Sequence, residues 1–383
     1  MANCIPINHD VLIWARKTAG FAQEDMLKSF PRYTEWEAGK SNPTYNQLDN
    51  LASKFHRPVA VFFFPEIPKE DSIEKSLRAM NEEDIEHFTP TVRFLFRKAK
   101  VFQICLGELY EGQIEEQIKK ISWLNMHNNN QSIPELANEV RKYFNISIDE
   151  QSSWKNSEEA LNKWRDVLAR KGIFVFKESF KNDFVSGFCI YDAVFPIIFI
   201  NNSLSKNRQI FTMFHELAHL LFAESYLDVF DSGFWRLEYE NPNHIEVKCN
   251  AFAGEFLIPD KVFIESISTD SDIDENIKNL AGRFNVSKEV ILRKFLNKKY
   301  IDRVFYEQKI DQWSKKRQKQ QKESKVGGNY FNTKLAYLGD NYLDVVFTKY
   351  NQGKITLEQA SEYLDIKVKS FSGIEDSFLG KAR

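Results

Sequence analysis

Two histidines and a glutamate with the spacing H-E-x-x-H occur near the middle of the chain, at His215, Glu216 and His219. Residues four apart lie on one face of a helix, so both imidazole rings can point at the same ion. Zn²⁺ accepts histidine nitrogens at about 2.0–2.1 Å. Glu216 leaves the helix in another direction, where its carboxylate can take a proton from a water molecule. The pattern predicts a zinc-dependent hydrolase with His215 and His219 as ligands and Glu216 as general base.

A catalytic zinc site needs a third protein ligand and keeps one position open. Two downstream residues could supply it, His244 and Glu246. Glu246 lies in the first turn of an expected helix that ends at Pro259, where the helix dipole favours a carboxylate. Glu255 lies near the far end of that helix, about 10 Å or more from Glu246, so the two carboxylates should not share one ion. The residues alone leave His244 and Glu246 open as the third ligand.

The elements around the motif indicate its setting. Three β-rich runs at 173–176, 185–190 and 196–200 precede an apolar helix expected at about 206–222, which carries the two histidines. Most of the remaining chain has helical periodicity. We therefore predict an α+β fold that is predominantly helical, with a small sheet and the H-E-x-x-H helix as the core, flanked by helical units of helix-turn-helix type.

Residues 211–221, together with 246–253 and 257–259, resemble the ImmA/IrrE family of zinc metallopeptidases, which has a gluzincin-like ligand set. The resemblance extends upstream through 172–175, 187–188 and 200–201, and covers about 150–300. It implies that His215, His219 and Glu246 bind zinc and that Glu216 is the catalytic base. The resemblance assigns no role to His244. This residue could orient Glu246, stabilise the oxyanion, or do neither. The resemblance also implies a protein substrate, a repressor of the Xre helix-turn-helix type, in a stress or mobile-element response.

The first 70 residues resemble an Xre-type helix-turn-helix domain at 15–16, Gly20, 36–39, 43–44, Leu48 and 51–52. Such domains bind operator DNA through the second helix of the motif. Two observations weaken that expectation. The segment 21–35 is about four residues shorter than the usual pattern, and residues 1–70 hold 8 Lys and Arg against 8 Asp and Glu, which gives no basic total. Docking of a protein or dimerisation is the alternative.

Composition shifts and helix signals divide the chain into six expected parts. These are a helix-turn-helix-like domain at 1–70, a helical connector at 71–150, the zinc peptidase domain at 151–265, a second helix-turn-helix-like domain at 266–312, a basic linker at 313–329 and a C-terminal helical unit at 330–383. The second helix-turn-helix pattern rests on the helical run from Ile277 and on Ser287 as an N-cap. We find no long repeat with a fixed period.

Composition is that of a globular protein of 383 residues with a net charge of −2, so the whole molecule offers no strong field for nucleic acid or an anionic membrane. Its four cysteines are scattered and include no C-x-x-C pair. The N-terminus does not read as a signal peptide, and no apolar run is long enough to span a bilayer. We expect a cytoplasmic protein with free thiols and no membrane partner.

Three functions fit these residues. The first is a zinc-dependent endopeptidase that cleaves an Xre-type repressor. The second is a DNA- or protein-binding regulator without proteolytic activity, whose zinc site is structural or vestigial, for instance closed by His244 as a fourth ligand. The third is a metal-dependent hydrolase of non-peptide bonds.

Overall fold

The computed structural model describes residues 4–70, 89–126, 131–181, 185–222, 226–229, 245–321 and 329–381. The chain forms two compact units, residues 1–101 with 180–182, and residues 102–179 with 183–383. The long helix α7 (Pro90–Leu109) contributes residues to both. The predominantly helical α+β fold expected from the sequence is confirmed. None of the helices in the described ranges is both long and apolar enough to cross a membrane.

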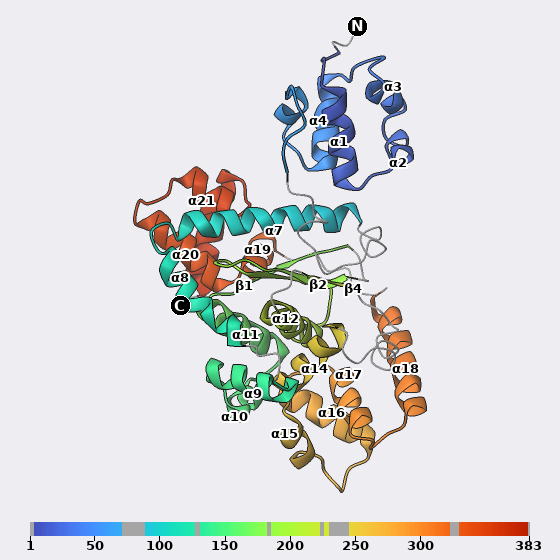
Figure 1. Cartoon of the computed structure of the whole chain (residues 1–383), viewed down its shortest axis with the longest axis vertical. Helices are drawn as coiled ribbons and strands as arrows, with labels where there is room; N and C mark the ends of the chain where they lie inside the picture. Colours follow the sequence, from blue (N-terminus) through green and yellow to red (C-terminus); the bar gives the residue numbers. More distant parts are fainter. Residues whose placement is uncertain are drawn as a thin grey trace. The chain divides into compact units, whose positions relative to one another are not determined.

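The first unit is a small helical body with its own apolar core (Figure 1). Its elements are α1 (His9–Ala19), α2 (Gln23–Leu27), α3 (Tyr33–Glu37), α4 (Tyr45–Phe55) and the 3₁₀ helix η1 (Val59–Phe63). Asn8 caps α1, and Thr44 forms a capping box with Gln47 at the start of α4. Both α2 and α3 are short, with five residues each.

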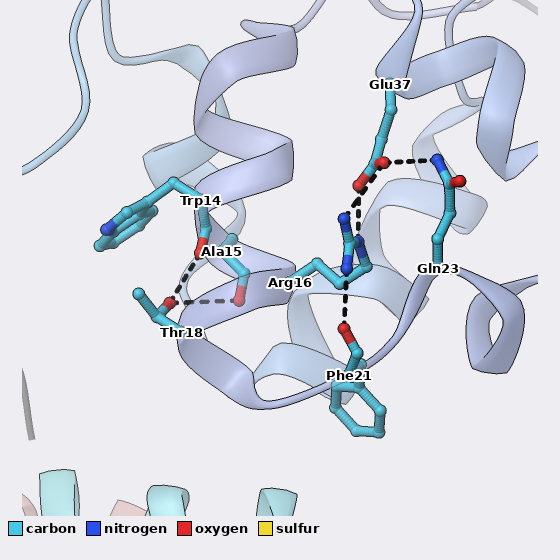
Figure 2. A network of polar contacts seen from close by, with 7 residues as sticks. All are labelled: Trp14, Ala15, Arg16, Thr18, Phe21, Gln23 and Glu37. Atoms are coloured by element: carbon cyan, nitrogen blue, oxygen red, sulfur yellow. Dashed lines mark hydrogen bonds and ion pairs between the residues drawn. The ribbon is translucent and has the colours of Figure 1, made fainter. Parts of the chain in front are cut away.

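A polar network ties α1 to α2 and α3 (Figure 2). The Arg16 guanidinium donates from Nε to Glu37 Oε1 at 2.7 Å and from Nη1 to the Phe21 carbonyl at 2.8 Å. Gln23 Nε2 donates to Glu37 Oε2, also at 2.7 Å. Because Arg16 and Glu37 are both largely buried, this ion pair holds the short α3 in place better than an exposed pair would.

The second unit is built on a four-stranded sheet of β1 (Phe174–Glu178), β2 (Val185–Ile190), β3 (Ile197–Asn201) and β4 (Tyr226–Val229). The order is β1-β3-β2-β4, with β1 and β3 parallel and the other pairs antiparallel. Every residue of β2 and β3 is buried, which agrees with their mostly apolar sequences. The helix α12 (Lys206–Leu221) packs against one face (Figure 1). The other face meets α7 and α20, through ring contacts of Phe102 and Tyr342 with Phe176.

The remaining helices surround this core. They are α8 (Ile114–Ile121), η2 (Ser122–Met126), α9 (Ile133–Phe144), α10 (Ile148–Ser153), α11 (Ser157–Arg170), α14 (Ile245–Leu257), α15 (Asp260–Glu265), α16 (Ile273–Phe284), α17 (Lys288–Asn297), α18 (Arg303–Gln321), α19 (Tyr330–Leu338), α20 (Asp340–Asn351), α21 (Leu357–Tyr363), η3 (Val368–Ser370) and α22 (Phe371–Lys381).

The apolar core of the second unit runs through several of the parts expected from the sequence. One continuous apolar core joins α9, α11, α12, α14, α16 and α17, and so crosses the expected boundaries at 150 and 265. The unit boundary itself falls inside α7, within the expected connector. The expected linker at 313–329 begins as regular helix, because α18 continues to Gln321. Long side chains of Lys, Arg and Gln favour helix, which accounts for this difference.

Candidate metal centre

The helix α12 carries both histidines of the H-E-x-x-H motif and is surrounded on all sides. His215 is 2% exposed, and Glu216 and His219 are fully buried. Its neighbours are β2 and β3, α11 and α14. Phe214 is stacked on Phe256 of α14, with ring centroids 4.2 Å apart, and meets Trp164 of α11 edge to face at 5.0 Å. Each such buried ring contributes about 1.5–3 kcal/mol, so α12 is firmly held between its neighbours.

This packing brings Glu246, in the first turn of α14, against the two histidines. Glu246 Oε2 lies 3.2 Å from His215 Nε2, and Glu246 Oε1 lies 3.1 Å from His219 Nε2. The two Nε2 atoms are 3.1 Å apart. The three side chains come from two helices, and their ligand atoms form one compact triangle.

The dimensions of this triangle suit a small divalent cation. Two ligands at about 2.0–2.1 Å from a tetrahedral zinc ion are about 3.3 Å from each other. The observed separations of 3.1–3.2 Å are close to that value. Two imidazoles and one carboxylate are also a donor set that zinc uses in catalytic sites. The residues present therefore fit a metal ion.

The charge of Glu246 is settled by its surroundings. Burial alone would raise the pKa of its carboxyl group, but the charges and hydrogen bonds of His215 and His219 outweigh burial and hold this pKa well below its usual range. The N-terminus of α14 acts in the same direction, since the helix dipole favours a negative charge there. Glu246 is thus a carboxylate, the form that binds a metal ion.

Asn250, one turn after Glu246 on α14, is hydrogen-bonded to the side chain of His215 and to the backbone of Glu246. The Nδ1–H of His215 donates to Asn250 Oδ1 at 3.2 Å, so the neutral, metal-binding form of His215 would carry its lone pair on Nε2, facing Glu246 and His219. Asn250 Nδ2 donates to the Glu246 carbonyl at 2.8 Å. One amide therefore orients one candidate ligand and the backbone of another. Sequence reasoning did not single out this residue, although its position four after Glu246 places both on one face of α14.

Glu216 lies where α12 packs closely against Gly187 of β2. A Cβ atom on Gly187 of β2 would lie 2.6 Å from Thr212 Cγ2, 2.8 Å from the Phe199 carbonyl oxygen and 3.4 Å from Glu216 Oε1. A side chain at this position of β2 would push α12 away, so glycine permits the close approach. The Glu216 carboxylate therefore lies between the sheet and the helix that bears the histidines.

The other residues considered from the sequence are placed as follows. His244 lies outside the described residues. Glu255 points away from the triangle, since its Oε2 accepts from Lys294 Nζ at 3.1 Å and its Oε1 accepts from the Asp260 backbone N–H at 2.9 Å. The structure thus brings together His215, His219 and Glu246, and uses Glu255 to join α14 to α15 and α17.

A buried helix with H-E-x-x-H, packed on a small sheet and faced by an acid from a second helix, is the arrangement of a metallopeptidase-type site. Residues 168–296 match the family model described as the IrrE N-terminal-like domain, Peptidase_M78. The match covers about a third of the chain and contains His215, Glu216, His219, Glu246 and Asn250. No curated protein matches the chain. The family match supports the ImmA/IrrE resemblance and a metallopeptidase-type function for this region.

Proposed function

We propose that the protein is a zinc-dependent endopeptidase with His215, His219 and Glu246 as zinc ligands and Glu216 as catalytic base. The observation that carries the proposal is the triangle of Nε2, Nε2 and carboxylate oxygen atoms, 3.1–3.2 Å apart, with Glu216 on the same helix as two of them. A bound zinc ion would supply Lewis acidity and a lowered pKa for water. Three protein ligands leave the fourth position that hydrolysis requires.

The chain's own residues would then act in sequence. Glu216 takes a proton from the attacking water and later delivers it to the amine nitrogen that leaves. Asn250 keeps the His215 ring in one tautomer through the whole cycle. Glu216 is buried against Gly187 of β2, and this burial keeps bulk water from competing for its proton.

Replacing Glu216 with Gln tests this role directly. We expect E216Q to bind zinc with the stoichiometry of the native chain, because Glu216 is not a proposed ligand, and to lose peptide cleavage by at least about 100-fold, the usual contribution of a general base. Zinc is measured by elemental analysis and cleavage by mass spectrometry on folded helix-turn-helix repressors and on unstructured peptides. Native-level cleavage by E216Q would exclude the mechanism.

A repressor of Xre type is our proposed substrate, and cytoplasmic action follows from that partner.

A non-proteolytic regulator with a structural zinc site is the second candidate. It is favoured by the burial of the ligands, since both histidines are at most 2% exposed. The two readings differ in what metal removal does. A structural site contributes folding energy directly, so a chelator should unfold the chain, whereas a catalytic site should lose activity with a smaller change in Tm.

A further inference from the structure

Asn201, the last residue of β3, is fully buried and its side chain reaches the neighbouring strand β2. Asn201 Nδ2 donates to the carbonyl of Val185, the first residue of β2, at 2.8 Å. The paired register of β2 and β3 runs from Gly187–Ile200 to Ile190–Ile197, so this bond lies just beyond the end of that register. A side-chain amide thus extends the contact between the two strands to the start of β2.

The anchored end of β2 is irregular. Val185 pairs with Val229 of β4 and Gly187 pairs with Asp228, so two steps along β2 match one step along β4. Ser186 is the additional residue, as in a β-bulge. A bulge bends its strand and redirects the side chains beside it, and bulges recur next to active sites. Because Val185 directly precedes the bulge, the bond from Asn201 fixes β2 at the point where the strand changes course.

Gly187 directly follows the bulge and is the residue of β2 that lies against α12. A Cβ atom on Gly187 would lie 2.6 Å from Thr212 Cγ2 and 3.4 Å from Glu216 Oε1. The backbone of β2 therefore forms one wall of the space that holds the Glu216 carboxylate. Only two residues separate this wall from the carbonyl that Asn201 holds, so a displacement of Val185 would be passed on to it.

We propose that Asn201 is a positioning residue for the proposed general base, Glu216. The Asn201 amide holds the bulged end of β2, and β2 in turn holds Gly187 against α12 and limits where the Glu216 carboxylate can lie. Misplacement of a reacting group by about 1 Å can lower a rate by about 100-fold. The inference rests on the proposed endopeptidase function, because Glu216 is a base only in that function.

Asn201 also shapes the turn that leads from β3 into α12. Its Oδ1 accepts from the Ser203 backbone N–H at 3.1 Å and from Ser203 Oγ at 2.8 Å, as in an Asx turn. The two roles use different atoms of one amide, so substitutions can separate them. N201D keeps an oxygen for Ser203 and removes the N–H that Val185 accepts. S203A removes one donor to that oxygen and leaves the bond to Val185 in place.

Asn276 of α16 provides a matched control for the loss of a buried amide donor. It is 5% exposed, and its Nδ2 donates to the carbonyls of Ser268, Ser271 and Asp272 at 2.9–3.1 Å. Its Oδ1 accepts from a backbone N–H, as Asn201 Oδ1 does. N276D should therefore weaken the fold in the same way as N201D, but at a place that does not bear on β2.

Denaturant unfolding of the full-length variants tests the contact without any measurement of activity. If Asn201 acts through Gly187, the loss in free energy of unfolding of N201D/G187A should be smaller than the sum of the two single losses, because both changes disturb one contact. N276D/G187A should give the sum. Additive losses in N201D/G187A would overturn the proposal. N201A, which removes both bonds and adds no charge, takes the place of N201D in every test if N201D does not fold.

Kinetics of the zinc-loaded full-length protein test the positioning of Glu216. We expect N201D to lower kcat by about 10–100-fold with KM and zinc content unchanged, whereas S203A and N276D keep the native kcat. Added to E216Q, N201D should cause no further loss, because no base is left to position. Native kcat in N201D, or an equal loss in the E216Q background, would overturn the proposal. Absence of cleavage by the native chain would instead refute the proposed function, and the unfolding data would still decide whether Asn201 acts through Gly187.

Discussion

At the scale of single residues, the centre depends on side chains of two kinds. In the proposed function, His215, His219 and Glu246 would provide the atoms that touch the metal ion, and Asn250 accepts a hydrogen bond from one of these ligands, His215. Outer partners of this kind change metal affinity without being ligands, since they set the tautomer and orientation of the imidazole. Asn250 is therefore the position where the geometry of the centre can be tested apart from its donor set.

We expect N250A to weaken zinc binding by about 10–100-fold, because His215 Nδ1 loses its acceptor and the ring can turn or change tautomer. N250D is the matched control: it keeps an oxygen for His215 and loses the donor to the Glu246 carbonyl. Competition titration with a chromophoric chelator measures both affinities. Unchanged affinity in N250A would show that the hydrogen bond to His215 does not matter for the centre.

The sequence predicted some of these residues and not others for physical reasons. His215 and His219 follow from helical spacing, because two ligands four apart must share a face. Glu246 was favoured by its place in a first turn and by resemblance. Neither helical spacing of ligands nor the resemblance pointed to Asn250, because a residue that only accepts a hydrogen bond from a ligand belongs to no motif with a fixed spacing.

At the scale of elements, the second unit contains two similar helix pairs. In α9–α10, a 12-residue helix starts after the N-cap Ser132 and ends at Asn145 with φ 57°, and Ser147 caps the next helix. In α16–α17, a 12-residue helix starts after Asp272 and ends at Asn285 with φ 53°, followed by a cap at Ser287. The pattern at α16–α17 was visible in the sequence. The similarity of α9–α10 to α16–α17 was not visible, because it lies in the capping residues and in an asparagine with left-handed backbone, and no repeat of fixed period marks it.

The two helix pairs are joined to each other by buried hydrogen bonds. Gln151 Nε2 donates to the Phe284 carbonyl at 2.9 Å, and Asn285 Nδ2 donates to the Trp154 carbonyl at 3.1 Å. In α17, the side chains of Ile291 and Phe295 lie in the apolar core. One face of α17 therefore packs into the apolar core of the second unit.

The contact between β2 and α12 yields a prediction at this scale. G187A places a methyl group 2.6 Å from Thr212 Cγ2 and 2.8 Å from the Phe199 carbonyl, so strand and helix must separate. We expect a loss of about 1–3 kcal/mol in the free energy of unfolding and a fall in activity, because Glu216 shifts with α12. Denaturant unfolding measures the first quantity.

Gly254 of α14 is the matched control for this variant. A Cβ atom there meets nothing within 4 Å, so G254A should leave stability unchanged or raise it by up to about 1 kcal/mol. Equal effects of G187A and G254A would show that the close approach at β2 is not what glycine provides.

At the scale of the whole molecule, charge and architecture bear on the partner of the first unit. Of the five residues in α3, Tyr33 and Trp36 are buried and Glu37 is paired with Arg16. Glu35 Oε2 accepts from Arg32 Nη2 at 2.7 Å. Thr34 is then the only residue of α3 that is neither buried nor ion-paired. DNA base edges are read mainly by Arg, Lys, Asn and Gln, and α3 contains none of these. Residues 1–70 also carry as many acids as bases. We propose a protein partner rather than operator DNA for this unit.

We therefore expect the full-length protein to retard genomic DNA fragments weakly and without preference for sequence. A unit that neutralises few phosphates releases few counterions, so the binding constant should change little with salt. Shift assays at about 50 and 200 mM salt measure this, since six to ten phosphate contacts would lower affinity by about 10³–10⁵ over that range. E24K/E35K is an internal control, because two added cations on α2 and α3 should steepen the salt dependence. A steep slope with a fragment-specific shift in the native protein would favour the DNA-binding regulator over a protein-docking unit.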